Sequence, residues 1–169
     1  MKKGTVYFFT GLSGAGKTTL GGLFYRRLKA AKPNVVWLDG DQLRPMFDVD
    51  TGYSFEERKR GAYRNFRLCK MLADQGIDVV LCSISMYRDV RVWNRENIDN
   101  YREIYIKVSR ETLFRRDQKG LYSAGKNVIG IDLPFEEPES PDVVVTNDGI
   151  QTPEELVGRL EQQFFRGKT

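Results

Sequence analysis

The sequence contains no histidine, and this absence removes whole classes of catalytic mechanism. Triads of the Ser–His–Asp type are excluded, because no imidazole is present to act as the base. Any acid–base chemistry must therefore use carboxylates, lysine, hydroxyl groups or water.

Cysteine and long apolar runs are also scarce. The two cysteines, Cys69 and Cys82, are too few for a disulfide framework, and we expect both to be reduced core thiols. The apolar runs are far shorter than a membrane span. Met1–Lys3 leads directly into strand-like residues, so we expect no signal peptide and a cytoplasmic protein.

Neither sign of charge dominates the chain. Its 169 residues include 27 Lys and Arg and 23 Asp and Glu, for a formal net charge of +4. The basic residues are spread along the chain, so nucleic-acid binding is not indicated, and small anionic molecules account for the excess equally well. No repeat or linker divides the sequence, and we expect a single domain over residues 1–169.

One glycine-rich motif stands out from this background. Gly11–Thr18 fits G-x-x-x-x-G-K-[ST], with a predicted strand before it (5–10) and a predicted helix after it (18–29), which is the setting the motif requires. Its backbone N–H groups can cradle a phosphate, Lys17 can reach the β and γ phosphates, and Thr18 can ligate Mg²⁺. A chance glycine-rich turn is the alternative.

Strands and helices alternate along the rest of the chain. Further strands are predicted at 34–39, 78–83, 101–108 and 142–146, and helices at 54–75, 90–97, 110–116 and 153–165. Continuous β-branched strands between helices predict an α/β fold, a P-loop NTPase three-layer sandwich with a mostly parallel sheet flanked by helices on both faces. Residues 117–141, rich in Gly, Pro and charge, are expected to form a mobile lid.

Polar segments follow three of these strands. Because ligands bind beyond the carboxyl ends of parallel strands, we expect Gly11–Thr18, Asp39–Asp41 and Ser83–Arg88 around one crevice. Asp39 and Asp41 can hold Mg²⁺ or accept a proton from an attacking hydroxyl. A solvated Asp-Gly turn is the alternative.

Three arginines come soon after these carboxylates. Arg44, Arg58 and Arg64 have the planar forks that bind phosphate or sulfate oxygens bidentately. The alternative is a solvated, charged helix face.

Together these motifs resemble the adenylylsulfate kinase family. The resemblance also extends to segments 38–44, 50–54, 85–88, 116–122 and 130–138. That family transfers the γ-phosphate of MgATP to the ribose 3′-hydroxyl of adenosine 5′-phosphosulfate, with a P-loop nucleotide-kinase fold. The resemblance implies a cytosolic phosphotransferase with an alcohol group as acceptor, which uses Mg²⁺ and small nucleotides, binds neither nucleic acid nor membrane, and forms a homodimer.

The resemblance also implies roles for matching positions. The residues implied to bind ATP are Gly11, Leu12, Ser13, Gly14, Ala15, Gly16, Lys17, Thr18, Thr19, Arg116 and Lys119. The implied catalytic residues are Lys17, Asp39 and Asp41, with Thr18 and Asp41 on the metal side. The implied acceptor-binding residues are Asp39, Arg44, Tyr53, Arg58, Ser85, Met86, Lys119 and Val128. Among these, Arg44 and Arg58 would grip the 5′ anionic group, and Tyr53 would stack on the base.

Departures from the family pattern concern the acceptor. Gly61 replaces the asparagine of an Arg-x-x-Asn motif, Met86 replaces a proline, and Val128 replaces a second aromatic residue in a shorter lid. Losing one face of an aromatic sandwich costs on the order of 1 kcal/mol of base binding.

These departures make the chain similar to a branch of the family, the cytidine diphosphoramidate kinases of bacterial capsule phosphoramidate biosynthesis. They phosphorylate the ribose 3′-hydroxyl of cytidine 5′-diphosphoramidate. The alternatives are an adenylylsulfate kinase and a non-catalytic nucleotide sensor on the same fold. A P-loop GTPase is disfavoured because the sequence has no Asn-Lys-x-Asp motif.

Overall fold

The computed structural model describes residues 2–47, 52–117, 120–124, 128–131 and 133–165. Five strands form one sheet in the order β2-β3-β1-β4-β5, and every neighbouring pair in this described sheet is parallel. The strands are β1 (Val6–Thr10), β2 (Val35–Asp39), β3 (Asp78–Cys82), β4 (Tyr101–Lys107) and β5 (Val143–Thr146).

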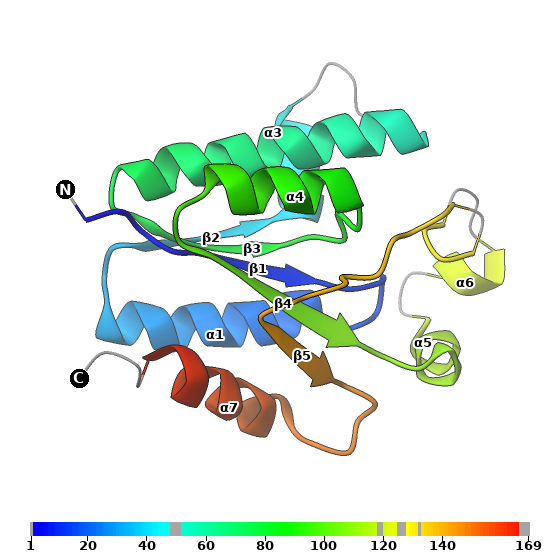
Figure 1. Ribbon diagram of the computed structural model, residues 1–169. Coiled ribbons are helices and arrows are strands. Elements are labelled where there is room, and N and C mark those ends of the chain that lie inside the picture. The colour runs from blue at the N-terminus through cyan, green and yellow to red at the C-terminus, as the bar shows by residue number, and fades with distance from the viewer. Residues whose placement is uncertain (1, 48–51, 118–119, 125–127, 132, 166–169) are drawn as a thin grey trace.

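Helices cover both faces of this sheet, which gives the three layers expected from the sequence (Figure 1). Helices α1 (Lys17–Ala31) and α7 (Pro153–Phe165) lie on one face, and α3 (Phe55–Asp74) and α4 (Arg88–Asn97) lie on the other. Helix α2 (Gly40–Met46) follows β2 directly, and α5 (Arg110–Arg116) and α6 (Leu121–Ala124) lie beyond the carboxyl end of β4. The α/β sandwich prediction is confirmed.

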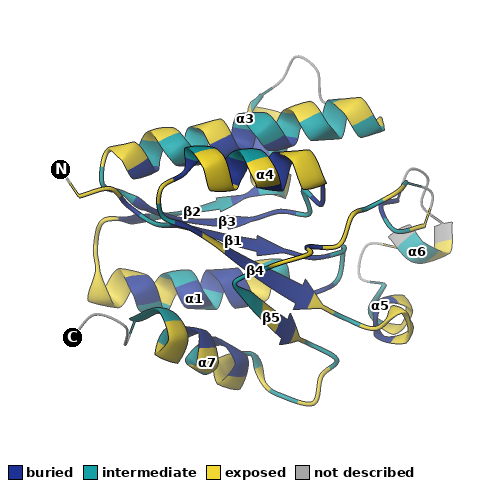
Figure 2. Cartoon of the chain, in the orientation of Figure 1, coloured by how far each residue is buried: buried dark blue, intermediate teal, exposed yellow. Residues whose placement is uncertain are grey.

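Strand β1 is buried on both sides because it is the middle strand of the sheet (Figure 2). Phe9 points into the layer of α1 and α7, with its ring centroid 5.4 Å from that of Phe24. Phe8 points into the layer of α3 and α4, where it packs edge-on against Phe66 at 4.8 Å. Because successive side chains of a strand point to opposite faces of the sheet, β1 packs into both apolar cores. This packing fixes the position of β1 and therefore of the loop that follows it.

Local signals in the sequence place the helix ends. Oγ of Ser109 accepts a hydrogen bond from the Thr112 N–H at 3.2 Å, as its predicted capping role requires. Thr152 and Glu155 form a reciprocal pair of hydrogen bonds at the start of α7. The cysteines are free and buried, as predicted, and burial raises the pKa of the Cys82 thiol to about 12.

Two helices were not predicted from the sequence. Helix α2 forms because the Asp39 carboxylate accepts a hydrogen bond from the Asp41 N–H at 2.9 Å, an N-cap that looks like a plain Asp-Gly turn in the sequence. The other, α6, is four residues long and lies within the predicted lid, whose role stays a prediction. In the described part of the chain, no helix is long and apolar enough to cross a membrane.

Candidate active site

The glycine-rich loop connects β1 to α1 at the carboxyl edge of the sheet. Gly14 and Gly16 have φ angles of +79° and +97°, the left-handed region that side chains disfavour. A Cβ on Gly16 would also come within 2.6 Å of the Asn147 side chain, whose Nδ2 donates to the Ala15 carbonyl at 2.8 Å. Lys17 Nζ donates to the Leu12 carbonyl at 2.8 Å, which holds the ammonium group across the loop.

A carboxylate joins this loop to the end of β2. Oδ2 of Asp39 accepts a hydrogen bond from the Thr18 hydroxyl at 2.7 Å, while its Oδ1 caps α2 through the Asp41 N–H. Asp39 is buried and Asp41 is exposed. The Asp39–Gly40–Asp41 segment thus places one carboxylate on the Thr18 hydroxyl and a second beside the cavity described next.

A cavity of about 440 Å³ opens over these groups. Thirteen of the residues implied by the resemblance line it: Ser13, Gly14, Gly16, Lys17, Thr18, Thr19, Asp39, Asp41, Arg44, Tyr53, Arg58, Ser85 and Val128. Gly11, Leu12 and Ala15 lie in the loop without lining the cavity, and Lys119 lies outside the described residues. The three segments that the sequence placed around one crevice therefore meet.

Two guanidinium groups lie close to the ring of Tyr53, which lines the cavity. Cζ of Arg44 is 3.8 Å from the centre of its ring, and Cζ of Arg58 is 5.2 Å away. The Arg58 Nε also donates to the Tyr53 carbonyl at 3.0 Å. Burial, reinforced by the charge of Arg44, lowers the pKa of the Arg58 guanidinium. Two cations on one exposed aromatic ring suit a ligand that combines a flat group with an anion.

The loop after β3 forms another wall. Ser85 has a φ of +39°, in the left-handed region that non-glycine residues disfavour, and its Oγ lies 2.5 Å from Oγ of Ser83. Strained backbone of this kind gathers at functional sites. Met86 does not line the cavity: its side chain is 2% exposed and packed inward, and its carbonyl accepts from the Glu136 N–H at 3.1 Å.

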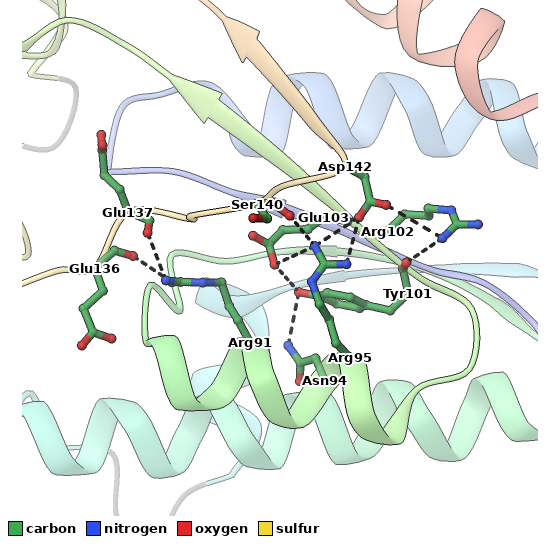
Figure 3. A network of polar contacts seen from close by, with 10 residues as sticks. All are labelled: Arg91, Asn94, Arg95, Tyr101, Arg102, Glu103, Glu136, Glu137, Ser140 and Asp142. Atoms are coloured by element: carbon green, nitrogen blue, oxygen red, sulfur yellow. Dashed lines mark hydrogen bonds and ion pairs between the residues drawn. The ribbon is translucent and has the colours of Figure 1, made fainter.

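A polar network connects α4, the helix that follows this loop, to the segment after α6 (Figure 3). Arg91, on α4, donates to the carbonyls of Glu136 and Glu137 at 2.8 and 3.1 Å. Arg95, one turn later, instead donates to the Ser140 carbonyl at 2.8 Å and lies 3.4 Å from the Asp142 carboxylate. Because the Glu136 N–H donates to the Met86 carbonyl, Arg91 holds segment 136–137 beside the loop after β3, much of which lines the cavity.

Comparison with known proteins identifies the fold family. A sequence model of adenylylsulphate kinases matches residues 3–146. The chain belongs to the adenylylsulfate kinase family. It is therefore a phosphotransferase, a kinase that transfers phosphate to a hydroxyl group of a nucleotide.

Individual members of the family are similar over most of the chain. A cytidine diphosphoramidate kinase from Campylobacter jejuni is 38% identical over 159 residues, covering 90% of this chain and 91% of the relative. An adenylyl-sulfate kinase from Picosynechococcus sp. is 39% identical over 167 residues, covering 96% and 94%. The structure of the Mycobacterium tuberculosis APS kinase in complex with AMPPNP and APS superposes with a TM-score of 0.85, at 29% identity, over 96% of this chain and 98% of that one.

Sequence reasoning named Arg116 as an ATP-binding residue but missed Asn147 and residues 149–153, which line a second hollow beside the glycine loop. This hollow of about 410 Å³ shares Gly14, Gly16 and Thr19 with the first cavity and is completed by Arg116, Asn147 and residues 149–153. Arg116 donates to the Gly14 carbonyl at 3.3 Å and to the Asn147 carbonyl at 2.7 Å. The Asn147–Gly149 turn after the last strand was a usable signal, since ligands gather at the carboxyl ends of parallel strands.

Proposed function

We propose that this kinase transfers the γ-phosphate of ATP to the ribose 3′-hydroxyl of cytidine 5′-diphosphoramidate. The observation that carries the proposal is the exposed ring of Tyr53, which lies beside Arg44 and Arg58 in the wall of a cavity that Val128, an aliphatic residue, also lines. One aromatic face matches a pyrimidine better than a purine, which gains more from stacking on two faces.

The donor would lie along the glycine loop, whose Gly14 and Gly16 line both hollows. Its phosphates would lie on the loop N–H groups and the Lys17 ammonium, and its nucleoside would lie in the hollow beside Arg116 and Asn147. The acceptor would lie in the larger cavity, with its 5′ anionic group on Arg44 and Arg58 and its base on Tyr53. This arrangement directs the acceptor's ribose toward Asp41.

Phosphoryl transfer needs positioning and charge stabilisation more than covalent catalysis. The exposed carboxylate of Asp41 would accept or orient the proton of the 3′-hydroxyl, and the Lys17 ammonium would stabilise the negative charge on the transferred group. Asp39 would act through Thr18 and through the capped start of α2, both of which it holds by hydrogen bonds. With no histidine in the chain, a carboxylate is the fitting proton acceptor.

The residues at this place also fit Mg²⁺. The Thr18 hydroxyl and the carboxylates of Asp39 and Asp41 are hard oxygen ligands, and Mg²⁺ binds through one or two such groups plus substrate phosphates. No cluster of three or more carboxylate, cysteine or histidine side chains suited to a metal occurs among the described residues, which agrees with a metal that arrives with the nucleotide. When bound, Mg²⁺ neutralises charge on the β and γ phosphates.

The decisive experiment compares two acceptors. The protein is incubated with MgATP and either cytidine 5′-diphosphoramidate or adenylyl sulfate, and kcat/KM is measured for each. We expect the cytidine compound to be preferred. A clear preference for adenylyl sulfate would identify an adenylylsulfate kinase, the function of several relatives at 36–39% identity. ATP binding without turnover of either would indicate a nucleotide sensor.

The homodimer implied by the family resemblance belongs to this proposal as well. Sedimentation velocity of the full chain measures it directly. A single species at the monomer mass of 19.5 kDa over a wide concentration range would contradict it.

A further inference from the structure

Three buried polar side-chain atoms of the described chain have no hydrogen-bond partner there, and two of them belong to residues that line the cavity. These two are Nε of Arg64 and Oδ1 of Asn65, on consecutive residues of α3. The third, Oδ1 of Asn94, lies in α4 outside the cavity lining. An unpaired buried polar atom costs about 1–3 kcal/mol, so a concentration of them in a cavity wall calls for a ligand that pairs with them.

Asn65 is placed to meet such a ligand. Asn65 lies at the middle of α3, is 9% exposed and lines the cavity, and the N-terminal end of the helix extends past the carboxyl ends of the strands (Figure 1). None of the described residues forms a hydrogen bond with its side chain. A half-turn of the amide therefore exchanges its donor and its acceptor without breaking a bond, so either can face the cavity.

The neighbouring turn of α3 leaves room for a flat group. Gly61 lies one helical turn before Asn65, and a Cβ added there would meet only Nη2 of Arg64 among the described residues outside its own helix backbone, at 3.7 Å. Ala62, also in the cavity lining, is small. The amide that the family pattern has at position 61 is thus absent, and Asn65 supplies one a turn deeper.

We propose that Asn65 determines base specificity by pairing with the hydrogen-bonding edge of the acceptor base. Its Oδ1 accepts from the exocyclic amino group, and its Nδ2 donates to the adjacent ring nitrogen. Tyr53 contacts the face of the base while Asn65 reads its edge. The inference rests on the proposed function only in that the acceptor is a nucleotide, because cytosine and adenine both present an amino group next to a ring nitrogen.

The test is a cycle that changes one group on the protein and one on the ligand. Wild type and Asn65→Ala are assayed with the native acceptor and with its counterpart lacking the exocyclic amino group. These counterparts are the pyrimidin-2-one riboside 5′-diphosphoramidate for cytidine and the purine riboside 5′-phosphosulfate for adenosine. We expect wild type to lose about tenfold or more in kcat/KM when the amino group is removed, and the variant to lose less than about twofold.

Asn94→Ala is the matched control, because it also removes a buried amide with an unpaired Oδ1. It should keep the wild-type ratio between the two ligands. Asn65→Leu, closer to asparagine in volume, replaces the alanine variant if thermal unfolding shows that the latter is not folded. An equal loss in wild type and in the Asn65 variant would overturn the inference.

Calorimetry repeats the cycle as a binding measurement: wild type and Asn65→Ala are each titrated with the native acceptor and with its counterpart lacking the amino group. A non-hydrolysable ATP analogue is present throughout. Failure of wild type to phosphorylate either acceptor would overturn the proposed function. The binding cycle would still decide the role of Asn65, so the two failures are distinguishable.

Discussion

At the residue scale, Lys17 is the charge that the loop geometry holds most directly. Its Nζ is tied to the Leu12 carbonyl, so replacing the side chain removes a positioned cation while the backbone N–H groups remain. We expect Lys17→Ala to lower kcat/KM by at least about 100-fold, the typical cost of removing one stabilising group from a transition state. A coupled ADP-release assay measures the rate, and an unchanged melting temperature would show that the fold is intact. A near-native rate would contradict the kinase mechanism.

A proton-accepting role of Asp41 can be distinguished by experiment from a purely structural role. The Asp41 N–H donates to the Asp39 carboxylate, which caps α2. Asp41→Asn keeps this backbone hydrogen bond and removes only the negative charge of the side chain. We expect kcat to fall by about 10²–10⁴-fold with little change in the KM for ATP, the range for losing a general base. Asp89→Asn is the matched control, since Asp89 is likewise an exposed carboxylate in the first turn of a helix, and should leave the rate unchanged. Equal rates for the two variants would exclude a proton-accepting Asp41.

At the scale of elements, Arg91 holds segment 136–137 against the loop between β3 and α4, which forms one wall of the cavity. It donates to the Glu136 and Glu137 carbonyls, and the Glu136 N–H donates to the Met86 carbonyl in the loop between β3 and α4. We expect Arg91→Ala to raise the KM for the acceptor about five- to tenfold, because misplaced walls weaken binding without removing a group that contacts substrate.

Arg95→Ala is the control for this contact. It removes an arginine from the same network, but its partners are Ser140 and Asp142, whereas the Arg91 partner Glu136 is bonded to the cavity-lining loop between β3 and α4 through Met86. Both variants should lower the melting temperature, while Arg95→Ala should leave the acceptor KM unchanged. A similar acceptor KM in the two variants would show that Arg91 only stabilises the fold.

The elements themselves show where prediction from sequence succeeds. The ten strands and helices expected from the pattern were found within about two residues, because burial imposes its own period on each of them and caps such as Ser109 mark their ends. Helix α2 was missed because its evidence is a contact: the Asp39 side chain caps it, while Gly40 and Pro45 argue against a helix. The short α6 has too few residues for any period to show.

At the scale of the whole molecule, buried acids with raised pKa values limit stability in alkali. Burial, with a contribution from the charge of Asp78, raises the pKa of Tyr7 from 10.0 to about 12. The unfolded state therefore releases this proton first, so the associated stability is complete below pH 10 and is lost as the pH rises to 12. The Cys82 thiol also lowers the stability of the folded protein as the pH rises above about 9, since burial raises its pKa to about 12 as well.

We expect the free energy of unfolding to fall steeply between pH 10 and 12, with about 3 kcal/mol of the fall due to Tyr7. Urea unfolding at pH 8, 10, 11 and 12 measures this dependence. The free energy of unfolding of Tyr7→Phe should fall less steeply over this pH range. The difference in the free energy of unfolding between the two proteins at pH 8 is the baseline for this comparison. Parallel curves for wild type and variant would show that Tyr7 does not carry the effect.

The sequence by itself determined the fold class, the phosphate loop and the approximate crevice, because each depends on local periodicity, a contiguous motif or a topological rule. Tertiary structure alone decided which side chains meet. Asp39, at the end of β2, reaches Thr18 at the start of α1, although β3 lies between β2 and β1. The ring of Tyr53 comes close to Arg44 and Arg58, and Met86 turns inward. Asn65, which looks like an ordinary polar residue in a charged helix, lies in the cavity wall with an unpaired oxygen. Packing makes such contacts between residues far apart in the chain, and no local pattern encodes them.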